Sequence, residues 1–262
     1  MKTRNDNTGS ILKLIKLPDL LSICNALLGF SAILFVLGGV NERVIKNALV
    51  LILVAAVVDG LDGMVARNIE CSPLGKYLDS LADMVSFGVA PAIVAYVLLR
   101  NYLHVYDYAY AYVTLALCGA YVISGMLRLA RFDAKPFFQK ESFTKEKVHF
   151  EGLPITGSAI FLASFMLVFI ELQLPSQLYP FLLIALMGIL CGLMTSRIRY
   201  GNIRDKRVVI PVGIVFFMLF FFYKFFSLPF VYPTAVIFAL TAFYICSPLI
   251  LPNHKLQAPN SK

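Results

Sequence analysis

The sequence predicts an all-α protein, a polytopic membrane helical bundle of about eight transmembrane helices. Hydrophobic residues make up 59% of the 262-residue chain and charged residues 15%, whereas a soluble domain is about half apolar and about a quarter charged. Uncharged runs of membrane-spanning length recur along the chain, and most Lys and Arg fall on one side of the resulting topology. This composition excludes a disordered chain and argues against a water-soluble globule or a small disulfide scaffold.

Six uncharged runs could each cross a hydrocarbon core about 30 Å thick. They are Leu20–Val40, Tyr108–Leu127, Gly152–Ile170, Leu172–Ser196, Val208–Tyr223 and Phe225–Asn253. Two more helices are expected at roughly 47–67 and 79–99. In those two places, each apolar run is long enough only if its helix continues into the charged segment between them. The boundary between the last two spans, around Ser227–Pro233, is the hardest to assign because two prolines interrupt the pattern.

Eight spans put both chain ends on one side of the membrane, and that side then receives 19 of the 23 Lys and Arg. Because positively charged loops stay in the cytoplasm, we expect the basic side to be cytoplasmic in a multi-pass plasma-membrane protein. The expected surroundings are the lipid bilayer, with no nucleic-acid partner. We expect a cytoplasmic N-terminal segment (1–19), a six-helix catalytic core (20–205), two additional helices (206–250) and a cytoplasmic tail (251–262).

Four acidic residues fall in one stretch shared by two expected helices. Asp59 and Asp62 are three residues apart on one helix, and Asp79 and Asp83 are four apart on the next, so each pair shares a helix face. A short connection makes the two helices antiparallel neighbours, which brings the four carboxylates together at the membrane edge.

Carboxylates near hydrocarbon are costly and repel one another, and divalent cations remove both penalties. Oxygen ligands without His or Cys favour Mg²⁺, Mn²⁺ or Ca²⁺. Two such ions about 3.5–4 Å apart can clamp a phosphoryl group.

Small and basic residues accompany these acids. Gly63, with Gly60 beside it, and Ala66 leave room for a pyrophosphate or a neighbouring helix, and Arg67 can meet phosphate oxygens. Two other interpretations are open: scattered helix-end charges that face water, and a divalent-cation pathway through a transporter. Four acids at spacings of 3, 17 and 4 residues, accompanied by Gly63, Ala66, Arg67 and Gly75, disfavour the first. The sequence shows neither internal repeats nor broken helices in matching halves, which disfavours the second.

The acidic segment resembles the signature of the CDP-alcohol phosphotransferases, D-x2-D-G-x2-A-R-x8-G-x3-D-x3-D. All eight fixed positions are matched, by Asp59, Asp62, Gly63, Ala66, Arg67, Gly75, Asp79 and Asp83. The chain has seven residues, where eight are usual, between the arginine and the following glycine. This difference changes the length of the connection and leaves the helix register intact.

The resemblance implies a metal-dependent reaction. Family members bind a CDP-linked lipid at the cytoplasmic face, use two divalent cations (Mg or Mn) to hold its pyrophosphate, and usually form homodimers. One cation would be ligated by Asp59, Asp62 and Asp79, and the other by Asp62, Asp79 and Asp83. Asp83 would also be the catalytic general base that accepts a proton from the attacking alcohol, after which CMP leaves.

The resemblance also implies which residues contact the CDP-lipid. Asn25, a polar residue of the first span, resembles an Asn that lies near the cytidine in relatives; an interhelical hydrogen bond is its alternative role. The other candidates are the remaining fixed positions of the signature, Gly63, Ala66, Arg67 and Gly75.

Four further blocks are similar to the phosphatidylserine synthase branch of this family, so that the similarity covers roughly residues 18–205. They are Ser86–Pro91, Arg128–Asp133, Phe150–Pro154 and Thr195–Tyr200. The branch commonly has Asn where Asp133 stands. This similarity implies that a phosphatidyl or archaetidyl group passes to L-serine, since ester and ether lipids present the same CDP head. Inositol phosphate and glycerol phosphate stay open as alternative acceptors.

The serine-binding candidates lie at the end of the fourth span. Arg128 and Arg131, three residues apart, could pair the serine carboxylate, and Asp133 could meet its ammonium group. Arginines at a cytoplasmic helix end are also expected from topology alone, so a flanking role is the alternative for both.

Overall fold

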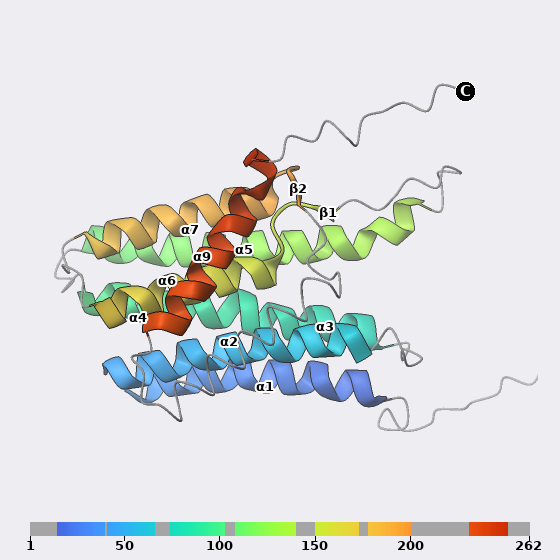
Figure 1. Cartoon of the computed structure of the whole chain (residues 1–262), viewed down its shortest axis with the longest axis horizontal. Coiled ribbons are helices and arrows are strands. Elements are labelled where there is room, and N and C mark those ends of the chain that lie inside the picture. Colours follow the sequence, from blue (N-terminus) through green and yellow to red (C-terminus); the bar gives the residue numbers. More distant parts are fainter. Residues whose placement is uncertain are drawn as a thin grey trace, which may run out of the picture.

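The computed structural model describes residues 15–39, 41–65, 74–102, 108–139, 150–172, 178–200 and 231–250, and most of them are helical (Figure 1). The third long helix is continuous and contains a π-helical segment, η2. The helices are α1 (Leu17–Gly38), α2 (Glu42–Val65), α3 (Gly75–Asp83), η2 (Met84–Val89), α4 (Ala90–Tyr102), α5 (Tyr108–Gln139), α6 (Ile155–Leu172), α7 (Tyr179–Thr195) and α9 (Val231–Ile250).

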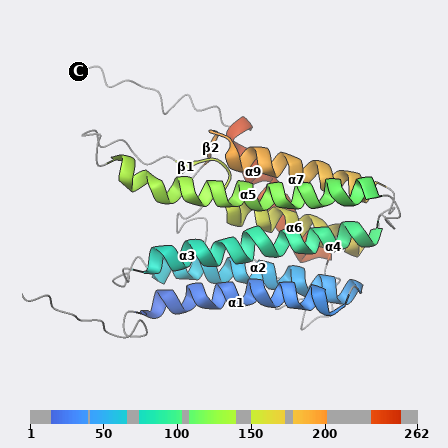
Figure 2. The same ribbon diagram turned by 180° about the vertical axis from the view of Figure 1, so that it is seen from behind.

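The helices lie side by side along one axis (Figures 1 and 2). Helices α1, α2 and α3–α4 form one group, α5, α7 and α9 lie on the other side of the bundle, and α6 contacts helices of both groups. From α1 to α7 the long helices alternate in direction, with α3–α4 as one of them, so α1 and α3 begin at the same end of the bundle where α2 and α5 finish (Figure 1). We call this the N-terminal end of the bundle, and the acidic residues lie there.

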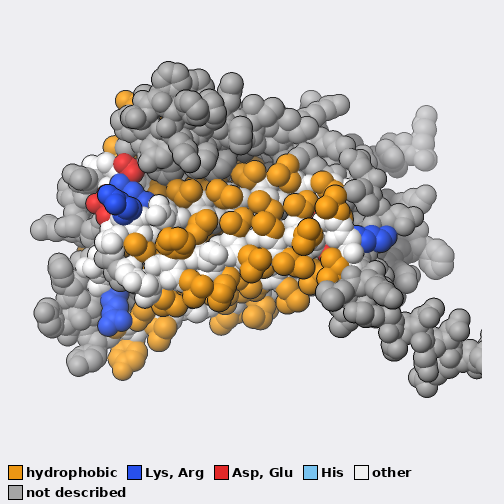
Figure 3. Space-filling view, turned by 90° about the horizontal axis from the view of Figure 1, so that it is seen from below, with side chains coloured by type: hydrophobic (Ala, Val, Ile, Leu, Met, Phe, Trp, Pro, Cys, Tyr) orange, Lys and Arg blue, Asp and Glu red, His pale blue; other side chains and the backbone are white. Residues whose placement is uncertain are grey.

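Among the residues that the structure describes, five helices are long and apolar enough to cross a membrane. They are Leu17–Gly38, Glu42–Gly63, Gly75–Asn101, Ala111–Ala134 and Ile155–Leu172, and α7 and α9 are shorter apolar helices. Figure 3 shows a face on which apolar side chains form a broad band, with Lys and Arg near both ends. Such an exposed apolar face suits contact with lipid.

The predicted all-α class is confirmed, and seven of the eight expected spans correspond to these helices. The span expected at Val208–Tyr223, most of segment 1–19 and the tail 251–262 lie outside the described residues. The count of eight therefore stays a prediction.

Two helix boundaries differ from the expected spans. Helix α5 continues beyond Leu127 to Gln139, because the uncharged run marks only the part in hydrocarbon while the helix extends into polar sequence. The run Leu172–Ser196 begins with the last residue of α6, and α7 starts only at Tyr179, with Pro180 in its first turn, where proline is tolerated.

Two short segments, one before α6 and one after α7, pair with each other and join the start of α6 to the end of α7. Strands β1 (Phe150–Glu151) and β2 (Arg199–Tyr200) pair antiparallel, and the Gly152 N–H donates to the carbonyl of Ile198 at 2.8 Å. Gly152 has φ +83°, and a Cβ there would lie 2.5 Å from the Met194 carbonyl oxygen. Only glycine suits this position. The paired strands and Gly152 therefore fix where α6 begins.

Ionic and aromatic contacts hold the rest of the bundle together. At the end opposite the acids, Lys46 of α2 pairs with Glu42 and with Glu171 of α6, each at 2.7 Å. Phe161 of α6 stacks on Phe238 of α9 with ring centroids 5.0 Å apart. Helix α6 is thus bound both to α2 and to the C-terminal helix.

Candidate active site

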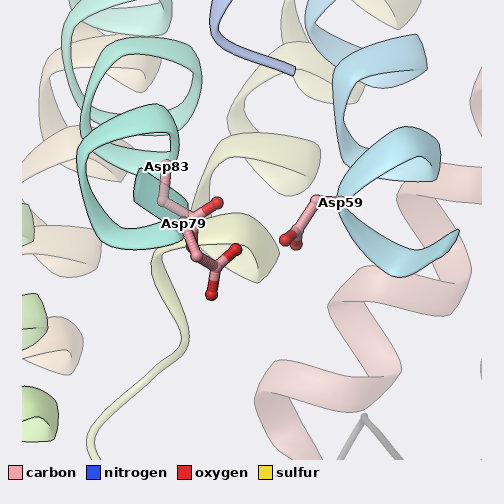
Figure 4. A group of neighbouring side chains, drawn as sticks. All are labelled: Asp59, Asp79 and Asp83. Atoms are coloured by element: carbon pink, nitrogen blue, oxygen red, sulfur yellow. The ribbon is translucent and has the colours of Figure 1, made fainter. Parts of the chain in front are cut away.

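Three acids from two helices meet at the N-terminal end of the bundle (Figure 4). Asp59 lies near the end of α2, and Asp79 and Asp83 lie on successive turns of α3. One carboxylate oxygen from each lies within 4.8 Å of those of the other two. Asp83 is buried and the other two are partly buried. Figure 4 shows the Asp59 carboxylate facing the pair on α3.

This group of oxygens fits a divalent cation. Oxygens that share one Mg²⁺ or Ca²⁺ at bond lengths of about 2.0–2.6 Å lie no more than about 4–5 Å apart, and the three carboxylates meet that limit. A set made only of carboxylates also has the chemistry that Mg²⁺, Mn²⁺ and Ca²⁺ prefer. Asp59, Asp79 and Asp83 could therefore hold such an ion.

Helix α1 supplies two donors to the acids. The Asn25 Nδ2 donates to Oδ1 of Asp83 at 3.3 Å, and the Ser22 hydroxyl donates to Oδ2 of Asp62 at 2.5 Å. All four residues are buried. Asp62 does not belong to the three-acid group, although it lies one turn from Asp59 on α2, and its role as a metal ligand stays a prediction.

A third donor comes from α6. The Thr156 hydroxyl, in the first turn of that helix, donates to Oδ2 of Asp59 at 3.3 Å. Because donors on neighbouring residues fix the orientation of metal-binding carboxylates, Thr156 and Asn25 set how two of the three acids point.

The helix widens directly after Asp83. The π-helical turns of η2 begin at Met84, and such turns inside α-helices occur frequently at functional sites. The Ser86 hydroxyl donates to the carbonyl oxygen of Asn25 at 2.8 Å. Gly29 makes this approach possible, because a Cβ at Gly29 would lie 2.5 Å from the Ser86 Cα. Close packing of α1 on η2 thereby holds Asn25 against Asp83.

Three of the five CDP-lipid candidates have described positions. Asn25 makes the interhelical contact to Asp83, and its side-chain Oδ1 is buried without a hydrogen-bond partner. A Cβ added to Gly63 would meet no atom within 4 Å, and Gly75 is the first residue of α3. Ala66 and Arg67 lie outside the described ranges.

Arg131 contacts the end of a neighbouring helix. Its guanidinium donates to three carbonyl oxygens that close α7, at 3.0–3.3 Å: those of Met194, Thr195 and Ser196. The last carbonyls of a helix have no donor within the helix, so Arg131 satisfies groups that would otherwise need water. This contact favours the flanking interpretation of Arg131, and its role in acceptor binding stays a prediction.

The other two acceptor candidates lie on either side of Arg131 on α5. The Arg128 guanidinium lies over the Phe132 ring, 5.6 Å from its centroid. Asp133 contacts α3: its Oδ2 accepts from the Ser80 hydroxyl at 2.8 Å, and its Oδ1 lies 3.3 Å from the Lys76 ammonium.

Sequence reasoning missed the residues that hold the acids. Ser22 could have been found, because it lies three residues before Asn25 on one face of an apolar helix. Thr156 carries a weak signal, two residues after Pro154 in an uncharged run. No local pattern pairs Ser80 with Asp133, which are 53 residues apart.

Comparison with known proteins agrees with this geometry. Residues 15–195 match the model of the family described as CDP-alcohol phosphatidyltransferase. Archaetidylserine synthase of Methanothermobacter thermautotrophicus is 34% identical over 200 residues, 75% of this chain and 74% of that protein. CDP-diacylglycerol–serine O-phosphatidyltransferase of Helicobacter pylori is 29% identical over 239 residues, 89% of each chain. The Saccharomyces cerevisiae protein of that name is 33% identical over 159 residues, 58% of this chain and 54% of that protein. The chain belongs to the CDP-alcohol phosphatidyltransferase family.

Proposed function

We propose that the protein is an integral-membrane phospholipid synthase that transfers a phosphatidyl-type or archaetidyl group from a CDP-lipid to L-serine and releases CMP. The observation that carries this proposal is the meeting of Asp59, Asp79 and Asp83 in a chain of this family. Serine as the acceptor is supported by similarity to proteins named archaetidylserine synthase and CDP-diacylglycerol–serine O-phosphatidyltransferase.

The acids hold and orient the reacting groups in this proposal. Two bound Mg²⁺ or Mn²⁺ ions would supply positive charge to the pyrophosphate and to the departing CMP. Asp59, Asp79 and Asp83, with Asp62 beside them, would ligate these ions. The serine hydroxyl oxygen would attack the β-phosphorus while the bond to CMP breaks, and the hydroxyl proton would pass to Asp83. The Asn25 amide, 3.3 Å from Asp83 Oδ1, would hold that carboxylate in position.

The CDP-lipid would contact α1, the end of α2 and the start of α3. Two observations support this assignment: the buried Oδ1 of Asn25 has no hydrogen-bond partner, and the space around Gly63 is open. A hydrogen-bond donor of the ligand could bind the Asn25 Oδ1, and a pyrophosphate could occupy the space beside Gly63. The proposed contacts are Asn25, Gly63, Ala66, Arg67 and Gly75.

Serine would bind beside the end of α5. Arg128 is the candidate for its carboxylate and Asp133 for its ammonium group. Asp133 contacts Ser80 of α3, the residue next to Asp79, and Arg128 lies five residues earlier on α5. Arg131 would hold the end of α7 next to them.

The acids would face the cytoplasm in the plasma membrane. The N-terminal end of the bundle carries Lys16, Lys76 and Arg128, which supports a cytoplasmic orientation by the bias of positive charge. We further propose a homodimer, as is usual in the family.

The proposal is tested with purified protein in detergent or vesicles. CDP-diacylglycerol or CDP-archaeol is mixed with Mg²⁺ or Mn²⁺ and with serine, inositol phosphate or glycerol phosphate, and CMP is measured. We expect CMP only with serine and a divalent cation. Turnover with inositol phosphate but not serine would overturn the acceptor assignment. Absence of CMP with every acceptor, together with metal flux into vesicles, would instead support the transporter alternative.

A further inference from the structure

Helix α3 carries a second set of polar residues beside its two acids. It is nine residues long, and its acids Asp79 and Asp83 are four residues apart. Lys76 and Ser80, also four residues apart, form a neighbouring stripe about 60° around the helix. The acids face α2, and the second stripe contacts Asp133 of α5.

Three polar contacts join this stripe to Asp133. The Ser80 hydroxyl donates to Oδ2 at 2.8 Å, and the Lys76 ammonium lies 3.3 Å from Oδ1. The same ammonium donates to the backbone carbonyl of Asp133 at 3.2 Å. Asp133 thus contacts two successive turns of α3. Contacts on two turns resist rotation and sliding of α3 together, whereas one contact would act as a pivot.

The rotation of α3 decides whether the acids meet. A carboxylate lies about 5–6 Å from its helix axis, so a rotation of about 15° moves it by about 1.5 Å. Asp79 is adjacent to Ser80, so the rotation that would take Asp79 away from Asp59 would also pull Ser80 from Asp133. A shift of about 1 Å in a reacting geometry can lower a rate about 100-fold.

We propose that Asp133 is a positioning residue for the metal-binding acids. It acts through Ser80 and Lys76 to fix the rotation of α3, and thereby holds Asp79 and Asp83 opposite Asp59. The effect on turnover rests on the proposed function, whereas the effect on cation affinity rests only on the three-acid group. This role differs from direct contact with the serine ammonium group, which would use the negative charge of Asp133. Positioning needs only an oxygen that accepts the hydrogen bond from Ser80.

Ser80→Ala tests the proposal at a residue that no acceptor role involves. Mn²⁺ affinity is measured by electron paramagnetic resonance on the substrate-free protein, and kcat and KM are measured by CMP release. We expect Mn²⁺ affinity and kcat each to fall about tenfold or more, with the KM for serine unchanged. Ser80→Thr keeps the hydroxyl and should restore both. The matched control is Ser164→Ala, because the Ser164 hydroxyl donates within its own helix, to Phe161.

Substitutions of Asp133 separate positioning from acceptor binding. Asp133→Ala should weaken Mn²⁺ binding at least as much as Ser80→Ala does, because it also removes the Lys76 ion pair. The double variant should be no worse than Asp133→Ala alone, because Asp133→Ala already removes the contact to Ser80. Asp133→Asn keeps an oxygen for Ser80 and should bind Mn²⁺ nearly as the parent protein does. If Asp133→Ala fails to fold, Ser80→Ala decides alone.

Wild-type Mn²⁺ affinity in Ser80→Ala would overturn the proposal. A second pattern would also overturn it: Asp133→Asn raises the KM for serine at unchanged Mn²⁺ affinity, and Ser80→Ala has no effect. That pattern is expected if Asp133 contacts the acceptor directly. If the parent protein binds Mn²⁺ but releases CMP with none of the acceptors, the proposed function fails while the Mn²⁺ comparison still decides this inference.

Discussion

Gly29→Ala should damage the active site without touching any of its acids. The added Cβ would lie 2.5 Å from the Ser86 Cα, whereas carbon atoms pack at about 3.5 Å or more. Helices α1 and η2 must therefore separate by about 1 Å. Ser86 cannot avoid the clash by changing rotamer, because the contacted atom belongs to the backbone. Overpacking of this kind costs about 1–3 kcal/mol of folding free energy.

The same displacement reaches the carboxylate of Asp83, the proposed general base. Asn25 lies one turn before Gly29, and its 3.3 Å contact to Asp83 is already near the limit for a hydrogen bond. A separation of about 1 Å breaks that contact and lets Asp83 turn, so we expect kcat to fall about 100-fold.

Thermal unfolding and CMP release measure the two effects of Gly29→Ala. The control is Gly38→Ala on the same helix, where a Cβ meets nothing within 4 Å. We expect the control to match the parent protein in both measurements. If Gly29→Ala were as stable and as active as Gly38→Ala, the close approach of α1 to η2 would not be what positions Asp83.

Three further substitutions probe the site. Gly63→Ala should raise thermal stability slightly, because its Cβ meets open space and alanine favours a helix more than glycine does. It should raise the KM for CDP-lipid about tenfold if the pyrophosphate occupies that space, and an unchanged KM would remove Gly63 from the binding site. Asp83→Asn should abolish transfer, because the proposed base and a proposed metal ligand are lost together. Glu171→Gln, at the far end of the bundle, is the control and should stay active. Full turnover in Asp83→Asn would rule out the base role. Arg131→Ala should lower the melting temperature, because three carbonyls at the end of α7 lose their donor. It should change the KM values for serine and CDP-lipid alike. A rise in the KM for serine alone would instead support a role of Arg131 in acceptor binding.

The sequence could predict the helices and the pairing of acids on them, because both follow from local spacing. Asp79 and Asp83 share a helix face by their separation of four residues, and the structure brings them to Asp59 as expected. The family signature could be read for the same reason, since its fixed positions lie within one short stretch.

Contacts between distant helices could not be predicted in this way. The π-helical turns after Asp83 lie where α1 approaches closely, and nothing in Met84–Val89 alone indicates a widened helix. Arginine at a helix end suits a ligand carboxylate and a helix carbonyl equally well, so the partners of Arg131 followed only from the fold. The grouping of three acids without Asp62 also depends on a tertiary contact, the hydroxyl of Ser22.

Helix α2 is bound to α6 near both of its ends. Lys46 meets Glu171 at one end, and thirteen residues later Asp59 meets Thr156 at the other. The two contacts are about 20 Å apart along the helix, so neither helix can slide past the other without breaking both. A thinner or thicker bilayer therefore has to be met by tilting of the whole bundle or by deformation of the surrounding lipid. The depth of Asp59 in the bilayer then changes with hydrophobic mismatch, while its position relative to Thr156 of α6 is preserved.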